Sequence, residues 1–177
     1  MSLHFYKPNQ KSTGTACSFW RNSEDNTFWI SLIKQDSWNS KTRTGSFSKN
    51  KDNPKKRVIV KFSDLEIAGL IDAIERNAEY KGYHGSQKQI VKFNFKPYIK
   101  NDEQLGFSFS VNREDKEDST DTQSYLIGFY YPEAMRLKIY LQTILTESYK
   151  AIDQAYEKKS QKSFSKDKSE ENEDYDF

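Results

Sequence analysis

Twice in this sequence, a stretch of alternating apolar and polar residues runs directly into the start of a helix, and this order limits the possible folds. In the first stretch, Arg57–Phe62, every second side chain is apolar and shares one face, the pattern of a half-buried strand. Ser63 follows directly and Glu66 stands three residues later, which is the spacing of a capping box at a helix start. Apolar residues then keep helical spacing until the pattern fades near Asn77. The sequence therefore predicts a strand followed without a loop by a short, one-faced helix.

The same order returns in the second half of the chain. Residues Gln123–Tyr131 alternate again, and Pro132 stands where the first turn of a helix tolerates proline. Apolar residues from Leu137 to Tyr156 continue a helical stripe, so the second helix is expected to be longer than the first. This stripe is longer than one small sheet can cover, which indicates self-association through the helices.

Other stretches rich in β-branched and aromatic residues supply the remaining strands. We expect strands at Leu3–Lys7, Thr15–Arg21, Thr27–Lys34, Lys88–Tyr98 and Leu105–Asn112, a short strand near Gly45–Ser48, and a turn or short strand at Tyr80–Ser86. The fold class is α+β, with an antiparallel sheet followed by a helix in each of two repeats, at about residues 1–78 and 79–157. Together they form one domain, 1–157. The Lys/Ser-rich and then acidic composition of residues 158–177 predicts disorder.

Few residues in this chain suit catalysis or metal binding. The single cysteine, Cys17, allows no intramolecular disulfide, and His4 and His84 are isolated. No phosphate loop, dinucleotide fingerprint or zinc-ligand spacing occurs. We therefore expect no enzyme activity, no cofactor and no metal. No stretch has the ~20 apolar residues of a membrane span, and no secretory signal is seen, so an intracellular, cytoplasmic protein is expected.

The charge is distributed unevenly along the chain. Ser169–Phe177 contains five acidic residues and no basic one, so residues 1–168 carry 28 basic and 21 acidic side chains, a net charge of +7. A basic body with an acidic tip indicates a polyanionic partner.

Aromatic side chains make up 15% of the chain, and flat rings beside basic residues suit the stacking and phosphate contacts of a single strand. The candidate nucleic-acid-binding residues are Lys11, Phe19, Trp20, Arg21, Trp29, Lys34, Trp38, Lys41, Arg43, Lys55, Lys56, Lys92, Lys96 and Tyr98. Plainer alternatives stay open. Phe19 and Trp29 also suit a core, Lys92 and Lys96 also suit a solvated face, and the basic stretch Lys41–Lys56 also suits a flexible linker.

The order of elements resembles the single-stranded-DNA-binding family that includes the Whirly proteins and the eukaryotic positive transcriptional cofactor. The resemblance is carried by Trp29–Lys34, a basic loop, the strand and helix in Lys56–Ile74, and the second strand-to-helix junction in Ser124–Leu145. It implies a Whirly-like fold with the helices in the core of a homo-oligomer, a dimer or a tetramer. It also implies binding of single-stranded DNA without base-specific readout.

The C-terminal tip carries a second resemblance. Residues 170–177, Glu-Glu-Asn-Glu-Asp-Tyr-Asp-Phe, are similar to the acidic, Phe-terminated tips of bacterial and phage single-stranded-DNA-binding proteins. The resemblance implies that Glu173, Asp174, Tyr175, Asp176 and Phe177 recruit replication or recombination proteins in a bacterial or phage-infected cell.

We therefore expect a protein that coats single-stranded DNA in replication or recombination. An RNA-binding protein or a transcription cofactor on the same fold, and a phage-type enzyme, remain as alternatives. A five-stranded OB barrel would keep the function and change the architecture.

Overall fold

The first half of the chain forms a four-stranded antiparallel sheet followed by a helix. The structure is a computed structural model that describes residues 1–118 and 120–170, without the side chains of residues 159 and 161–170. The sheet has the order β1-β2-β3-β6. Its elements are β1 (Ser2–Lys7), β2 (Thr15–Asn22), β3 (Thr27–Lys34), β6 (Arg57–Phe62) and α1 (Asp64–Arg76). Between β3 and β6 the chain forms a hairpin of β4 (Ser37–Asn39) and β5 (Thr44–Ser46), then the short 3₁₀ helix η1 (Ser48–Asn50). The short strand expected near residues 45–48 is thus one half of a hairpin.

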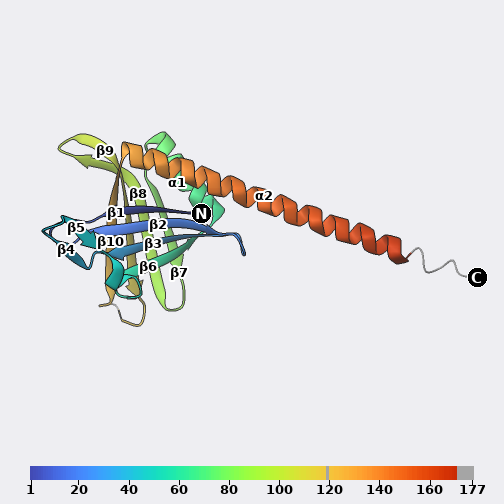
Figure 1. Cartoon of the computed structure of the whole chain (residues 1–177), viewed down its shortest axis with the longest axis horizontal. Helices are drawn as coiled ribbons and strands as arrows, with labels where there is room; N and C mark the ends of the chain where they lie inside the picture. Colours follow the sequence, from blue (N-terminus) through green and yellow to red (C-terminus); the bar gives the residue numbers. More distant parts are fainter. Residues whose placement is uncertain (119, 171–177) are drawn as a thin grey trace, which may run out of the picture.

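The second half repeats this order. Its sheet has the order β10-β9-β8-β7, built from β7 (Tyr80–Gly85), β8 (Gln89–Lys100), β9 (Glu103–Asp115) and β10 (Thr122–Tyr130), and it is followed by α2 (Tyr131–Glu170). The strands form the body of the molecule, α1 and α2 lie together at one end, and α2 extends far beyond the body (Figure 1). The predicted fold class, two antiparallel sheets each followed by a helix, is confirmed.

The two sheets pack face to face through phenylalanine rings. Phe62 of the first sheet lies 4.5 Å from Phe93 of the second, measured between ring centroids, and Phe5 lies 4.8 Å from Phe129. Because side chains alternate along a strand, the apolar set of each sheet faces the other sheet and the second set faces outward. The sheets therefore present two outer faces that point away from each other.

The helices cover one end of this core. Ser63 caps α1 and forms the expected capping box with Glu66. Helix α1 buries Ile67, Leu70 and Ala73, whereas α2 buries Leu137, Leu141 and Ile144 at the spacing expected from the sequence. The hydroxyl of Tyr140 lies 3.0 Å from the carbonyl oxygens of both Met1 and Phe19, which share its one proton, and burial raises its pKa to about 12. The N-terminal half of α2 is thereby fixed to the first sheet.

The C-terminal part of α2 departs from the expectation of disorder. The helix continues through Glu170, whereas the composition predicts disorder from residue 158. These residues include no glycine and no proline, and their lysine, glutamine and glutamate residues favour helix, whereas composition alone reports only that they cannot build a core. Residues 171–177, which include the predicted partner-binding tip, lie outside the described residues. Among the helices of the described chain, none combines the length and apolar character that a membrane span requires.

Candidate nucleic-acid interface

The outer face of the first sheet carries three rows of side chains that cross β1, β2, β3 and β6. The strand register places them as Ser2–Trp20–Trp29–Lys61, His4–Ser18–Ser31–Ile59 and Tyr6–Ala16–Ile33–Arg57. The first row holds Trp20 and Trp29 and the third row holds Tyr6, whereas the middle of the centre row has only the small side chains of Ser18 and Ser31. The face is therefore hollow between aromatic margins.

A pair of tryptophans forms one margin. The rings of Trp20 and Trp29 are nearly parallel, with an interplanar angle of 15° and centroids 6.4 Å apart, and both side chains are half-buried. Trp29 is held by a 2.7 Å hydrogen bond from its Nε1 to the hydroxyl of Thr27. The ammonium of Lys61 lies 6.0 Å from the Trp29 ring centroid. This margin combines an oriented flat surface with a positive charge.

The opposite margin is formed by Tyr6 and Phe47, whose ring centroids are 5.9 Å apart. Between the margins is a hollow of ≈ 660 Å³, whose lining includes Ala16, Ser18 and Ser31. In a strand, rows two residues apart are separated by roughly 7 Å, so the margins stand roughly 13 Å apart. That width accepts a nucleobase with its sugar.

Two polar side chains fix the loops that border this face. The side chain of Gln35 is buried. Its Oε1 accepts hydrogen bonds from the backbone N–H groups of Asn9 and Gly14, and its Nε2 donates to the carbonyls of Asn9 and Ser37. The carboxylate of Asp36 accepts hydrogen bonds from the Ser37 and Ser46 hydroxyls and from the Lys49 backbone N–H. These hydrogen bonds lower the pKa of Asp36, and the one from Ser37 has the largest effect. The β1–β2 loop and the β4–β5 hairpin are thereby tied to the end of β3.

Several of the predicted site residues lie on or around this face. Trp20 and Trp29 are on it, Trp38 is half-buried on β4, and the bordering loops carry the exposed side chains of Lys11, Lys41, Arg43, Lys55 and Lys56. These loops are rich in exposed cations, as the composition suggested.

Two of the predicted residues face the protein interior, and a third is only partly on this face. Phe19 is only 1% exposed and faces the second sheet, so its role as a stacking platform is wrong. Arg21 contributes to the lining of the hollow, but its guanidinium is engaged by the protein: its Nε donates to Asn26 at 2.6 Å and an η nitrogen lies 3.9 Å from Glu147 of α2. Lys34 points inward, with its ammonium 5.1 Å from the Tyr125 ring centroid. Burial and, secondarily, the charge of Lys56 lower the pKa of Lys34.

Lys92, Lys96 and Tyr98 lie on the outer face of the second sheet. They share this face with Lys81 and Tyr83, which pair with β8. Because the two outer faces point away from each other, the structure divides the predicted set between two surfaces of one chain.

Sequence reasoning missed three residues of the first outer face, namely Tyr6, Arg57 and Lys61. The signal for Arg57 and Lys61 was present, since the strand alternation put them on the face opposite the core. No group of three or more His, Cys, Asp or Glu side chains in the described part of the chain is arranged to hold a metal ion.

The arrangement of sheets and helices matches several solved structures. WHY1 from Arabidopsis thaliana is 12% identical, with a TM-score of 0.61 over 90% of this chain and 92% of that one. The plant transcriptional regulator PBF-2 is 11% identical, with a TM-score of 0.59 over 87% and 86%. The fold is Whirly-like. MRP1/MRP2 from Trypanosoma brucei is 13% identical, with a TM-score of 0.54 over 84% and 85%. No protein-family model matches the sequence, and no curated protein matches it.

The Whirly-like fold excludes the OB barrel considered above, because eight long strands form two sheets, each followed by a helix. The two strand-to-helix junctions predicted a duplicated unit, and the structure has this unit twice, as a sheet followed by a helix.

Proposed function

We propose that this protein binds single-stranded DNA along the outer face of its first sheet, without reading base sequence. The observation that carries the proposal is the oriented Trp20–Trp29 pair beside a hollow that is bordered by cations. Every base has a flat face, so stacking on such rings tolerates any sequence and contributes roughly 1 to 3 kcal/mol per base. Basic loops supply the phosphate contacts, which are equally independent of sequence.

A fluorescence titration tests this proposal directly. We expect oligo-dT to quench tryptophan emission, and the logarithm of the affinity to fall linearly with the logarithm of the salt concentration. Oligo-U and duplex DNA serve as competitors, because equal competition by oligo-U would assign the site to single strands of either sugar. Preference for the duplex, or a salt slope near zero, would contradict the proposal. Labelled DNA incubated with Mg²⁺ should stay intact if the protein is a binder and not an enzyme.

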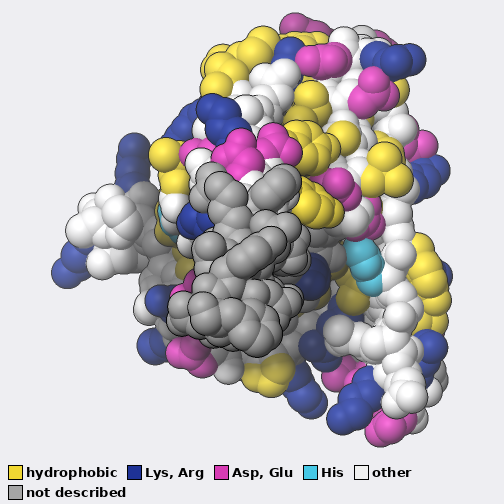
Figure 2. Space-filling model, turned by 90° about the vertical axis from the view of Figure 1, so that its right-hand side faces the viewer, with side chains coloured by type: hydrophobic (Ala, Val, Ile, Leu, Met, Phe, Trp, Pro, Cys, Tyr) yellow, Lys and Arg dark blue, Asp and Glu magenta, His cyan; other side chains and the backbone are white. Residues whose placement is uncertain are grey.

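The helices support a second part of the proposal, a homo-oligomer that is a dimer or a tetramer. Helix α2 exposes large apolar side chains at helical spacing: Tyr131, Met135, Ile139, Tyr149, Ile152 and Tyr156. Hydrophobic side chains are also visible on the side of the body from which this helix projects (Figure 2). An oligomer built on them would present several binding faces to one strand and so raise avidity. Light scattering should give a multiple of 20.8 kDa, and Ile139→Glu should lower it.

The acidic tip supports a third part, the recruitment of replication or recombination proteins. Carboxylates and a terminal Phe suit a basic patch with a small apolar pocket on a partner. Deleting residues 169–177 should leave DNA affinity unchanged or tighten it, because the tip competes with DNA for the basic face, and should abolish recruitment in a pull-down. Weaker DNA binding by the truncated protein would count against this part.

A further inference from the structure

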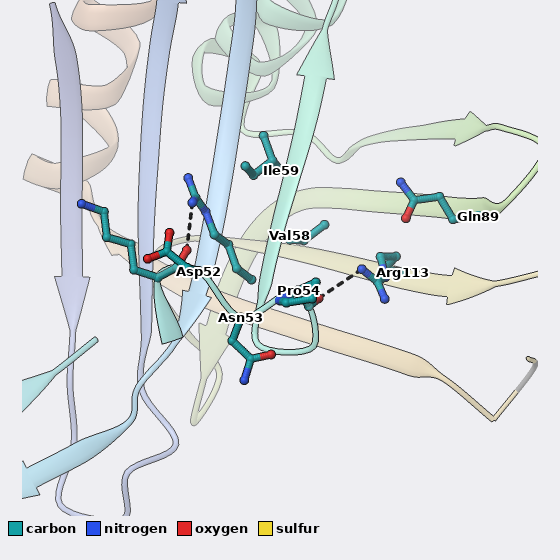
Figure 3. A pocket seen from close by; sticks show the side chains of 9 residues that line it. Asp52, Asn53, Pro54, Val58, Ile59, Gln89 and Arg113 are labelled. Atoms are coloured by element: carbon teal, nitrogen blue, oxygen red, sulfur yellow. Dashed lines mark hydrogen bonds between the residues drawn. The ribbon is translucent and has the colours of Figure 1, made fainter. Parts of the chain in front are cut away.

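A second pocket lies at the seam between the two sheets, beside the candidate interface. It has a volume of ≈ 340 Å³. Its lining comes from the turn before β6, from β6 itself, from the first residue of β8 and from the last part of β9. The residues are Lys51, Asp52, Asn53, Pro54, Arg57, Val58, Ile59, Gln89 and Arg113 (Figure 3). The two lining residues that come from the second sheet, Gln89 and Arg113, were not among the residues expected to bind nucleic acid.

Two arginines in this lining are held in place by the protein. Arg57 donates from Nε to the Ser31 hydroxyl at 3.0 Å and from an η nitrogen to the Lys51 carbonyl at 2.9 Å. Arg113 donates from one η nitrogen to the Pro54 carbonyl at 3.1 Å and from the other to Asp121 at 3.3 Å. Figure 3 shows Arg113 directed toward Pro54 across the seam. Both guanidinium groups are therefore oriented before any ligand arrives.

The pocket has the charge and the donors that an anion requires. Lys51, Arg57 and Arg113 are cationic, and Asp52 is the one carboxylate in the lining. A guanidinium has five N–H donors, and the two hydrogen bonds described for Arg113 use two of them. The buried Nε of Arg113 has no hydrogen-bond acceptor among the described residues. A buried N–H group without an acceptor costs folding free energy, so an acceptor supplied by a ligand would be favourable. Fixed guanidinium forks are the protein groups best suited to phosphate oxygens.

The pocket also opens onto the proposed path of the DNA. Lys51 and Arg57 line both this pocket and the hollow on the first outer face. Ile59 lines this pocket and the shallow depression beside Trp20 and Trp29. A strand whose bases stack on the tryptophans can thus place its backbone over the seam.

Given the proposed function, on which this inference rests, we propose that this seam pocket binds a phosphodiester group of the single strand between Arg57 and Arg113. Arg113 is then a binding residue contributed by the second sheet to an interface formed mainly by the first. The site sets where the strand leaves the outer face.

The test measures oligo-dT affinity and its salt dependence for four single variants of the full chain. Arg113→Gln should weaken binding about five- to tenfold at 0.1 M salt and reduce the salt slope by about 0.7, the loss of one phosphate contact on a single strand. Arg113→Lys keeps the charge but not the fork, so it should retain the slope and recover part of the affinity. Gln89→Glu puts a negative charge into the lining without changing either arginine and should also weaken binding. Gln87→Glu places the same charge two residues earlier, in the β7–β8 turn and outside the lining, and should have a much smaller effect.

The outcomes separate this inference from the proposed function. If the unchanged protein fails to quench with oligo-dT, the proposed function is overturned. If it binds, but Arg113→Gln keeps both affinity and slope, the seam pocket is overturned and the face remains. Equal losses for Gln89→Glu and Gln87→Glu would also overturn the pocket, because the effect would then be general repulsion. Should Arg113→Gln fail to fold, the two glutamate variants decide, since Gln89 is half-buried and Gln87 is exposed.

Discussion

The two sheets of this protein share one strand order but carry different outer faces. The first face has Trp20 and Trp29 in adjacent strands, whereas the second has tyrosines and lysines, including Tyr83, Lys92 and Lys96. Trp20 and Trp29 are half-buried, and a hydrogen bond to Thr27 orients Trp29, whereas Tyr83 is 59% exposed. A duplicated scaffold has thus kept its core pattern on both copies and varied its surface.

The difference is strongest in the connection before the last strand of each sheet. In the first repeat this connection, residues 35–56, carries six basic and two acidic residues and folds into the β4–β5 hairpin and η1. In the second repeat the corresponding connection, residues 116–121, carries one basic and three acidic residues. A polyanion is attracted to the first connection and repelled by the second. This difference favours the first face over the second as the surface on which we propose that the strand binds.

The largest effect is expected from removal of one tryptophan ring. Trp29→Ala should weaken oligo-dT binding by about 1 to 3 kcal/mol, roughly 5- to 150-fold, because a stacked base loses its platform. Tyr83→Ala on the second face is the matched control and should change affinity little. Fluorescence polarisation with labelled oligo-dT measures both, and thermal unfolding checks that each variant folds. Equal losses of affinity for the two variants would show that both faces bind the strand, which would contradict the proposed preference for the first face.

Neutralising charge should have a smaller effect. The pair Lys41→Gln and Arg43→Asn removes two cations from the hairpin turn, and Asn is chosen because residue 43 has a φ of 53°, which asparagine tolerates. We expect the salt slope to fall by up to about 1.4, as two phosphate contacts are lost. The pair Lys92→Gln and Lys96→Gln removes the same charge from the second face. A slope change as large for the second pair would assign DNA to that face too.

Much of the fold could be predicted from the sequence because its signals are local. The alternation in β6 and the capping box at Ser63 each depend on a few neighbouring residues, and both elements formed as expected. Two further local patterns, the Pro132 start and the stripe after it, predicted α2 equally well. Repetition of the same junction then supplied the architecture.

The site was harder to predict because it depends on contacts between distant residues. Strand β2 carries apolar side chains on both faces, so its pattern cannot tell that Phe19 is buried and Trp20 is not. Lys34 lies on the same side of β3 as the buried Ile30 and Leu32, and the ring of Tyr125 that its ammonium meets there comes from the other repeat. Arg113 reaches the interface through a hydrogen bond to the Pro54 carbonyl, 59 residues away in sequence. No local pattern contains that information.

The smallest predicted effect comes from the one carboxylate in the seam pocket. Asp52→Asn removes a negative charge from a lining that otherwise carries three cations, so it should tighten oligo-dT binding. At roughly 8 Å in a water-like dielectric, one charge contributes about 0.5 kcal/mol, which corresponds to about a two- to threefold gain at low salt. Glu117→Gln removes the same charge from the acidic connection of the second repeat and is the matched control. Isothermal titration at low and high salt measures both. A gain for Asp52→Asn that disappears at high salt, with none for Glu117→Gln, would place the phosphates nearer the first connection, whereas equal gains would mean that the strand responds only to the net charge of the protein.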